Sequence, residues 1–298
     1  MSRVMRPGVQ AVAAKGWLAA HKWLLLRRLA QFGVLACFLV GPWAGIWLLR
    51  GDMAASRLLD TVPLADPFIL LQSLAAGHLP EATALAGAAI VVGFYLLVGG
   101  RVYCSWVCPV NMVTDLAAWL RRRLGIKEGA RLAASSRYWL LAMLPVLALV
   151  IHTVVWELVN PVTMVSRGLL FGMGTGWWII VGVFFFDLLV AQRGWCGHIC
   201  PVGAFFSGLA LLSPIRVRAD GRERCSNCLD CFAVCPEPQV IAPTLRGASV
   251  GRDTVIDSPN CTNCGRCIDV CPERVFNLGI RFVGQQSETE NKQSAKRS

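Results

Sequence analysis

The amino-acid sequence predicts an α-helical integral membrane protein with four transmembrane helices and an internal two-fold repeat, followed by a small α+β domain. Three observations support this fold class. Of the 298 residues, 55% are hydrophobic and only 16% are charged, whereas soluble domains carry roughly 25% charged residues. Four long apolar segments are present, and lysine and arginine are concentrated in the loops on one side of them. Most of the 13 cysteines then fall into repeated patterns, in the membrane part and near the C-terminus.

The apolar segments come first along the chain. A transmembrane helix needs about 20 mostly apolar residues, and the segments that qualify span residues 30–49, 83–100, 138–159 and 176–191. Lysine and arginine are concentrated before the first segment and between the second and the third. Because cytoplasmic loops carry the excess of positive charge, we expect a multi-pass protein of the bacterial inner membrane with both termini in the cytoplasm.

The net charge of +11 comes mainly from these basic flanks, which we expect to bind membrane lipid. The sequence shows no helix-turn-helix pattern and no glycine-rich phosphate-binding loop. We therefore expect no nucleic-acid partner and no flavin or nicotinamide site.

Two identical cysteine patterns lie near the C-terminus. Residues 225–236 and 261–272 both read C-x2-C-x2-C-x3-C-P, which is the spacing of bacterial two-cluster ferredoxins. In that pattern the first three cysteines bind one [4Fe–4S] cluster and the fourth binds the other. We expect two clusters with these ligands: Cys225, Cys228, Cys231 and Cys271 for the first, and Cys261, Cys264, Cys267 and Cys235 for the second.

Two other uses of these cysteines fit the pattern less well. A structural zinc site closes with four ligands, usually from two C-x-x-C pairs, whereas each run here ends in Cys-Pro. A disulfide framework is typical of short secreted chains.

A second cysteine pattern repeats inside the membrane part. Residues 101–110 and 193–202 both contain C-x3-C-P, each after an apolar segment. Parallel repeats are related by an axis along the membrane normal, and sites form between them. We expect the repeat to bring four cysteines together as a third redox centre, as a dithiol pair or as simple packing: Cys104, Cys108, Cys196 and Cys200.

These features divide the chain into expected parts. A cytoplasmic N-terminus over residues 1–29 precedes the four-helix membrane domain over 30–192, in which one C-x3-C-P block follows the second helix. A cytoplasmic segment with the second block covers 193–215. The two-cluster ferredoxin domain follows over 216–283, and the polar tail over 284–298 is expected to be disordered.

With these motifs the chain resembles the NapH-type ferredoxin-like membrane subunits, the quinol dehydrogenase components of periplasmic nitrate reductase systems. The resemblance covers residues 29–282 and is most specific at 66–80, at 159–176, at both C-x3-C-P blocks and after Cys271. It implies a subunit that oxidises quinol from the membrane quinone pool. Electrons would pass, with a ferredoxin-type partner subunit, toward periplasmic nitrate reductase components. The chain would then be a component of an oxidoreductase more than a stand-alone enzyme.

Quinol oxidation releases protons, so the site needs proton acceptors. Ionisable groups inside membrane spans are costly and mark functional sites. The third segment contains His152 and Glu157, the fourth contains Asp187, and His78 lies in a short apolar outer loop. Each of these could equally face water, form an ion pair or hydrogen-bond the backbone. We expect the quinol ring to bind between the repeats and these four residues to serve it.

Two other functions remain open at this stage. The same clusters could serve a membrane assembly or maturation factor that reduces a metal or a disulfide, or a redox sensor. The β-sandwich domain that related assembly proteins usually add, and a signalling domain that a sensor would add, are not visible in the sequence.

Overall fold

The computed structural model of the protein describes residues 7–126, 128–130, 132–172, 174 and 176–281. The expected disordered tail over 284–298 lies outside the described residues. The chain divides into two compact units. The first unit contains Arg27–Phe94 and Tyr103–Gly208, and the second contains Arg6–Leu26, Tyr95–Val102 and Leu209–Ser298. The domain expected over 216–283 is thus joined by two segments from earlier in the chain.

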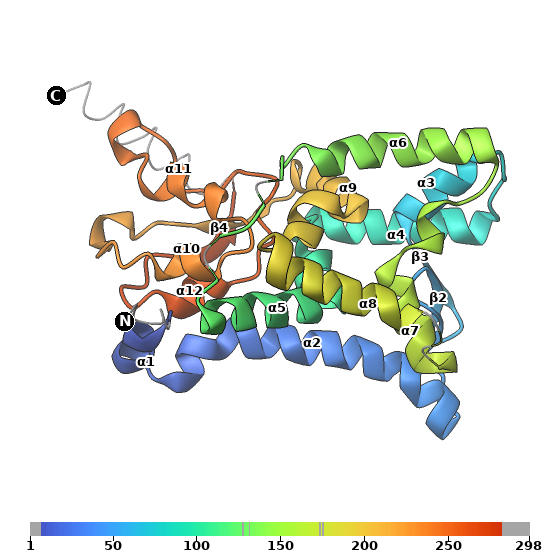
Figure 1. Ribbon diagram of the computed structural model, residues 1–298, viewed down its shortest axis with the longest axis horizontal. Coiled ribbons are helices and arrows are strands. Elements are labelled where there is room, and N and C mark those ends of the chain that lie inside the picture. Colours follow the sequence, from blue (N-terminus) through green and yellow to red (C-terminus); the bar gives the residue numbers. More distant parts are fainter. Residues whose placement is uncertain (1–6, 127, 131, 173, 175, 282–298) are drawn as a thin grey trace. The chain divides into compact units, whose positions relative to one another are not determined.

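Apolar helices form the first unit (Figure 1). The four predicted segments correspond to α2 (Trp17–Ala44), α4 (Ala82–Val98), α6 (Ser136–Ile151) and α8 (Gly176–Phe185), which continues as the π-helical turn η3 (Phe186–Val190). Among the described helices, α2 alone is long and apolar enough to cross a membrane by length and composition. The others are shorter apolar helices.

The third predicted segment is not helical throughout. Helix α6 ends because His152 adopts a left-handed backbone with φ 56°, a conformation that costs a non-glycine residue about 1–2 kcal/mol and cannot continue the helix. Glu157 lies beyond this break, in the short 3₁₀ helix η2 (Trp156–Leu158). The expectation that His152 and Glu157 lie within one helix over 138–159 is therefore corrected.

The first unit repeats one order of elements. The first copy consists of α3 (Pro67–Ala75), α4, the π-helical turn η1 (Tyr103–Val107) and α5 (Val110–Leu124). The second consists of α7 (Pro161–Phe171), α8, the π-helical turn η4 (Trp195–Ile199) and α9 (Pro201–Ala210). Helices α3 and α7 also begin alike, because Asp66 and Asn160 each accept a hydrogen bond from the backbone N–H two residues later and each precedes a proline.

A small antiparallel sheet completes the first unit. Strands β1 (Leu49–Gly51), β2 (Ala55–Leu58) and β3 (Val62–Ala65) pair in the order β1-β2-β3. Asp52 closes the first turn by accepting hydrogen bonds from the N–H groups of Ala54 and Ala55. The sheet follows α2 and leads into α3, so it occupies the first expected outer loop.

Short elements around the cysteine runs form the second unit. Strand β4 (Ile215–Arg218) pairs with β5 (Asn277–Ile280), antiparallel. The short helices are α1 (Val9–Lys15), α10 (Asp230–Val234), α11 (Ala242–Leu245) and α12 (Arg266–Val270), with the single 3₁₀ turns η5 (Arg222–Arg224), η6 (Pro238–Val240) and η7 (Ala248–Val250). Their shared core contains Val217, Ile241 and Ile256 together with three buried cysteines.

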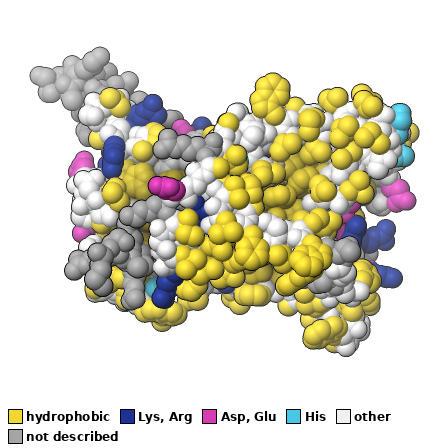
Figure 2. Space-filling view, in the orientation of Figure 1, with side chains coloured by type: hydrophobic (Ala, Val, Ile, Leu, Met, Phe, Trp, Pro, Cys, Tyr) yellow, Lys and Arg dark blue, Asp and Glu magenta, His cyan; other side chains and the backbone are white. Residues whose placement is uncertain are grey.

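Large apolar side chains remain exposed on the first unit. Trp139 and Val150 on α6 are 75% and 70% exposed, and Trp178 on α8 is 71% exposed. Figure 2 shows hydrophobic side chains gathered over α6 and α8 on the face in view. Contiguous apolar surface of this kind marks a protein or membrane contact.

Candidate iron–sulfur sites

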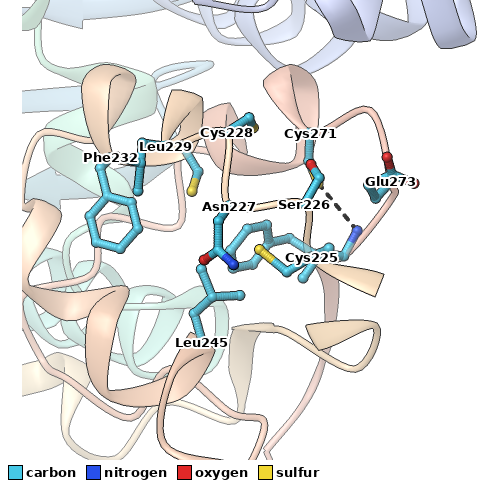
Figure 3. A pocket seen from close by; sticks show the side chains of 12 residues that line it. Cys225, Ser226, Asn227, Cys228, Leu229, Phe232, Leu245, Cys271 and Glu273 are labelled. Carbon is cyan, nitrogen blue, oxygen red and sulfur yellow. Dashed lines mark hydrogen bonds between the residues drawn. The ribbon is translucent and has the colours of Figure 1, made fainter. Parts of the chain in front are cut away.

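Four cysteines surround one cavity in the second unit. Cys225, Cys228, Cys231 and Cys271 line a space of about 360 Å³ together with Phe232 and Leu245. Figure 3 shows Cys225, Cys228 and Cys271 at this cavity, with Leu245 and Phe232 also at its edge. These four are the ligands that the spacing predicts for the first cluster, including the distant Cys271.

A second cavity in the same unit has the matching set. Cys261, Cys264, Cys267 and Cys235 line a space of about 350 Å³. Val217, Val240 and Ile256 form its apolar side. The near-equal volumes and the exchange of the fourth cysteine between the runs are what two equivalent [4Fe–4S] groups require, so the residues present fit the cofactor.

The two cysteine loops have the same backbone shape. Asn227 and Asn263 occupy equivalent positions and both have positive φ, 55° and 46°. Leu229 and Gly265 are also equivalent, with φ of 63° and 70°. Left-handed residues at these places turn the chain tightly enough for three cysteines of one run to face a single cavity.

Burial raises the pKa of four of the cluster cysteines, Cys231, Cys261, Cys267 and Cys271. Desolvation raises the pKa of Cys231 to about 12 and that of Cys261 to about 11. Because a thiolate is the iron ligand, binding must displace these protons. Within the described ranges, no three His, Cys, Asp or Glu side chains are grouped closely enough to hold a single metal ion.

The C-x3-C-P cysteines lie near one another in the first unit. The pKa of Cys108 is raised mainly by burial and then by the nearby thiols of Cys104 and Cys200. The pKa of Cys196 is also raised mainly by burial. The nearby Cys200 and Asp187 raise it further, and Cys108 and Cys104 contribute less. Both blocks form the same π-helical turn, since the N–H of Cys108 bonds the carbonyl of Tyr103 and the N–H of Cys200 bonds that of Trp195. The predicted convergence of these four residues is therefore present.

A buried ion-pair network holds the two blocks. Asp115 on α5 pairs with Arg27 at 2.9 Å and Arg28 at 2.7 Å on α2, and with Arg193 at 3.0 Å, three residues before Cys196. Burial opposes ionisation of Asp115, but these guanidiniums outweigh it and lower its pKa to about 2. We call Asp115, Arg27, Arg28 and Arg193 the Asp115 network.

Amide side chains extend the Asp115 network to the first block. Gln31, fully buried on α2, donates to the carbonyl of Ser105 at 3.1 Å and to Asn111 Oδ1 at 3.2 Å. Arg27 donates to the same two acceptors through Nε and Nη2. The backbone between Cys104 and Cys108 is thus fixed by side chains of α2.

The four predicted quinol-site residues do not lie in one place. His152 Nδ1 lies 3.3 Å from the carbonyl of Ala76, two residues before the exposed His78. Glu157 pairs with Arg167 at 2.9 Å. Asp187 is 1% exposed, accepts a hydrogen bond from the N–H of Trp195 at 2.9 Å and lies near Cys196. The structure thus brings Asp187, but not the other three, to the C-x3-C-P cysteines.

Sequence reasoning did not find the Asp115 network. Its members are far apart in the chain; Arg27 and Asp115, for example, are separated by 88 residues. The available signals were weak: Gln31 is a lone polar residue in the first apolar segment, and an arginine precedes each C-x3-C-P block.

Comparison with known proteins agrees with these sites. A family described as "4Fe-4S dicluster domain" matches residues 224–275, and a family described as "4Fe-4S binding domain" matches residues 82–127 and 173–219. The latter ranges contain both C-x3-C-P blocks. No solved structure is significantly similar to the chain.

Relatives are similar over most of the chain. The methylamine utilization ferredoxin-type protein MauN of Methylorubrum extorquens is 52% identical over 83% of this chain and 86% of its own. The ferredoxin-type protein NapH of Escherichia coli is 51% identical, over 80% and 83%. NapH of Haemophilus influenzae is 48% identical, over 90% and 93%. With 4Fe–4S domains in both halves and relatives at this level, the chain belongs to the NapH/MauN family of ferredoxin-type electron transport proteins.

Proposed function

We propose that this chain is the membrane-bound electron-transfer subunit of a quinol dehydrogenase. The observation that carries the proposal is the pair of equal cavities, each lined by four cysteines from the two ferredoxin runs. The ligands of the first [4Fe–4S] cluster are Cys225, Cys228, Cys231 and Cys271, and those of the second are Cys261, Cys264, Cys267 and Cys235. Each cluster stores one electron, so the pair matches the two electrons that a quinol gives up on becoming a quinone.

A multi-pass membrane location is part of this proposal. Support comes from the exposed apolar surface of α6 and α8 and from the basic loops at the ends of the apolar segments. Helices α4, α6 and α8 are shorter than a hydrocarbon core of about 30 Å requires, but π-helical turns follow α4 and α8 and add length there. We place both termini in the cytoplasm, following the distribution of lysine and arginine.

Quinol is the proposed reductant, and its two protons need acceptors. Asp187 is the strongest candidate, because its Oδ2 is buried and has no hydrogen-bond partner among the described residues. It also lies beside Cys196. His152, Glu157 and His78 are retained as acceptors for a quinol that binds at the α3 and α6 ends.

A third redox centre at Cys104, Cys108, Cys196 and Cys200 would connect quinol to the ferredoxin domain. The mutual proximity of the four thiols supports this role, as does the "4Fe-4S binding domain" family that covers both blocks. Packing is the competing role, since Cys108 belongs to an apolar cluster with Val110, Val162 and Val183.

Quinol-driven bleaching of the cluster absorption tests the function. The full chain in proteoliposomes would be given a reduced short-chain quinol without oxygen, and the visible absorption and EPR signals followed. We expect reduction in the wild type and at least tenfold slower reduction in Asp187→Asn, with the exposed Asp60→Asn as the matched control. Full rates in Asp187→Asn, His152→Ala, Glu157→Gln and His78→Ala would rule out this set. No reduction of intact clusters by any quinol would favour the assembly-factor or sensor alternatives.

The terminal acceptor is proposed to be a periplasmic nitrate reductase, reached through a ferredoxin-type partner subunit. The NapH relatives support this acceptor. A second electron-transfer system is supported by the MauN relatives, which are named for methylamine utilization and are 52% identical. Deleting the gene and measuring growth on nitrate as electron acceptor and on methylamine as substrate separates the two.

A further inference from the structure

The two cysteine loops share a backbone but differ in what covers them. In the first loop, Ser226 and Asn227 are exposed and Leu229 is 45% exposed. In the second loop, the corresponding Thr262 and Asn263 are 6% and 5% exposed, and Gly265 is buried. The two loops therefore differ in the neighbouring segments that pack on them.

The chain's own N-terminal segment covers the second loop on one side. A Cβ placed on Gly265 would stand 2.4 Å from the Trp23 ring, so the ring packs directly on this loop. Asp269, fully buried on α12, accepts hydrogen bonds from the N–H groups of Trp23 and Leu24 at 3.0 and 2.9 Å. These contacts fix the start of α2 on the second loop.

The segment after α4 covers the second loop on another side. A Cβ on Gly99 would meet the Asn263 amide at 2.7 Å. The buried Arg101 donates to Glu237 at 2.7 Å and to the carbonyl of Asn260 at 2.8 Å, beside Cys261. Both sides of the second loop are therefore occupied by segments of this chain, and Thr262 and Asn263 are buried.

The open first loop carries a particular chemistry. Leu229 gives an apolar centre, and Figure 3 shows Phe232 beside it at the first cavity. The Arg246 guanidinium lies 5.6 Å from the centroid of the Phe232 ring. Arg224 precedes Cys225 and donates to the carbonyl of Arg274 at 3.3 Å. The exposed charged side chains around this loop are three arginines, Arg224, Arg246 and Arg274, and two glutamates, Glu223 and Glu273, so the exposed part of the rim carries a net positive charge.

We propose that residues 226–229 with Arg224, Arg246 and Arg274 form the docking surface for an electron-carrier protein whose own docking face is acidic. The carrier would exchange one electron at a time with the first cluster, one side being oxidised as the other is reduced. The covered second cluster would exchange electrons within the chain. This inference rests on the proposed electron-transfer function, but its test does not use quinol.

Charged oxidants probe the surface in place of the unidentified carrier. The full chain, reduced by dithionite, is mixed in a stopped-flow instrument with ferricyanide, an anion, or with hexaammineruthenium(III), a cation, each of which takes one electron. In Arg224→Glu and Arg246→Glu we expect the ferricyanide rate constant to fall about 3- to 10-fold at low salt and the hexaammineruthenium rate constant to rise. Both effects should vanish at about 1 M salt.

Arg281→Glu is the matched control, since it makes the same charge change next to Asp257, away from the first cavity. It should leave both rate constants within about twofold. Equal effects in Arg281→Glu and Arg224→Glu, or none in either, would overturn the docking surface even if quinol reduces the clusters. If Arg224→Glu and Arg246→Glu change the oxidation rate constants as expected but quinol does not reduce the clusters, the quinol dehydrogenase function is wrong and the docking surface is still supported.

Hydrogen–deuterium exchange on the full chain gives a readout that does not depend on electron transfer. The amides of residues 226–229 should exchange at least tenfold faster than those of 262–265, because only the second loop is covered. Equal protection of the two loops would contradict the inference.

Discussion

The two units hold their cysteines by different means. In the second unit, two runs of identical spacing fold into the same left-handed loop, and each gathers its cysteines around one cavity. In the first unit, Cys104 and Cys196 lie on π-helical turns whose positions depend on side chains from α2 and α5. The C-x2-C-x2-C-x3-C-P pattern therefore positions its cysteines by the local backbone, whereas the C-x3-C-P cysteines are positioned by tertiary contacts with α2 and α5.

The largest expected effect compares the iron content of the two units. If each cysteine set holds one [4Fe–4S] group, the wild type contains about twelve iron atoms per chain, and Cys267→Ser or Cys200→Ser should each lose about four. Iron and acid-labile sulfide analysis of anaerobically purified protein measures this. Unchanged iron in Cys200→Ser would show that the first unit holds no cluster and that its cysteines pack or form a dithiol.

The Asp115 network gives the next effect. Asp115→Asn leaves three guanidiniums buried or half-buried without their carboxylate, and breaking a buried pair costs about 3–5 kcal/mol. Thermal unfolding in detergent, followed by tryptophan fluorescence, should show a clearly lower midpoint for the first unit. Asp60→Asn removes an exposed pair with Arg50 at 3.6 Å and should change the free energy of unfolding by less than about 0.5 kcal/mol. Equal midpoints for the two variants would mean that the network does not hold the blocks.

Sequence spacing was sufficient for the two cysteine sets of the second unit, because three ligands of each set lie within one loop. Cys225, Cys228 and Cys231 lie within one loop, and the rule that exchanges the fourth ligand supplies Cys271. Alternation of apolar segments and basic loops likewise gave the four main helices of the first unit, although α6 ends earlier than its apolar segment because of His152.

Long-range polar contacts could not be found in the same way. Nothing near Asp115 indicates that it meets Arg27, and nothing near Arg101 indicates that it meets Glu237, 136 residues away. Such pairs depend on how helices pack, which a periodic pattern does not encode. The packing of Trp23 on the second loop is also a long-range contact. The two cysteine runs have the same spacing, so the spacing does not indicate which of them is covered.

Gly265 offers a smaller effect that compares the two loops directly. Gly265→Ala places a methyl group 2.4 Å from the Trp23 ring in a left-handed backbone, and overpacking together with that strain should cost about 2–4 kcal/mol. Gly251, with φ +69° and no atom within 4 Å of its Cβ position, is the matched control, and Gly251→Ala should cost only about 1 kcal/mol. The midpoint of urea-induced loss of the cluster absorption reports both. Equal losses of unfolding free energy in the two variants would mean that the Trp23 side chain moves aside and does not pack tightly on the second loop.

The smallest effect is expected at the equivalent residue of the first loop. Leu229 has a left-handed backbone with φ 63° and a half-exposed side chain. Leu229→Gly relieves strain of about 1–2 kcal/mol, but glycine loses about 0.5–1 kcal/mol more backbone entropy on folding. The two terms nearly cancel, so the free energy of unfolding, measured by urea denaturation, should change by less than about 1 kcal/mol. The rate constant of electron transfer from the first cluster to an electron-carrier protein should nevertheless fall, because the substitution removes the apolar centre of the docking surface. A large loss of stability would instead show that Leu229 packs within the unit, and it would remove the contrast between an open first loop and a covered second loop.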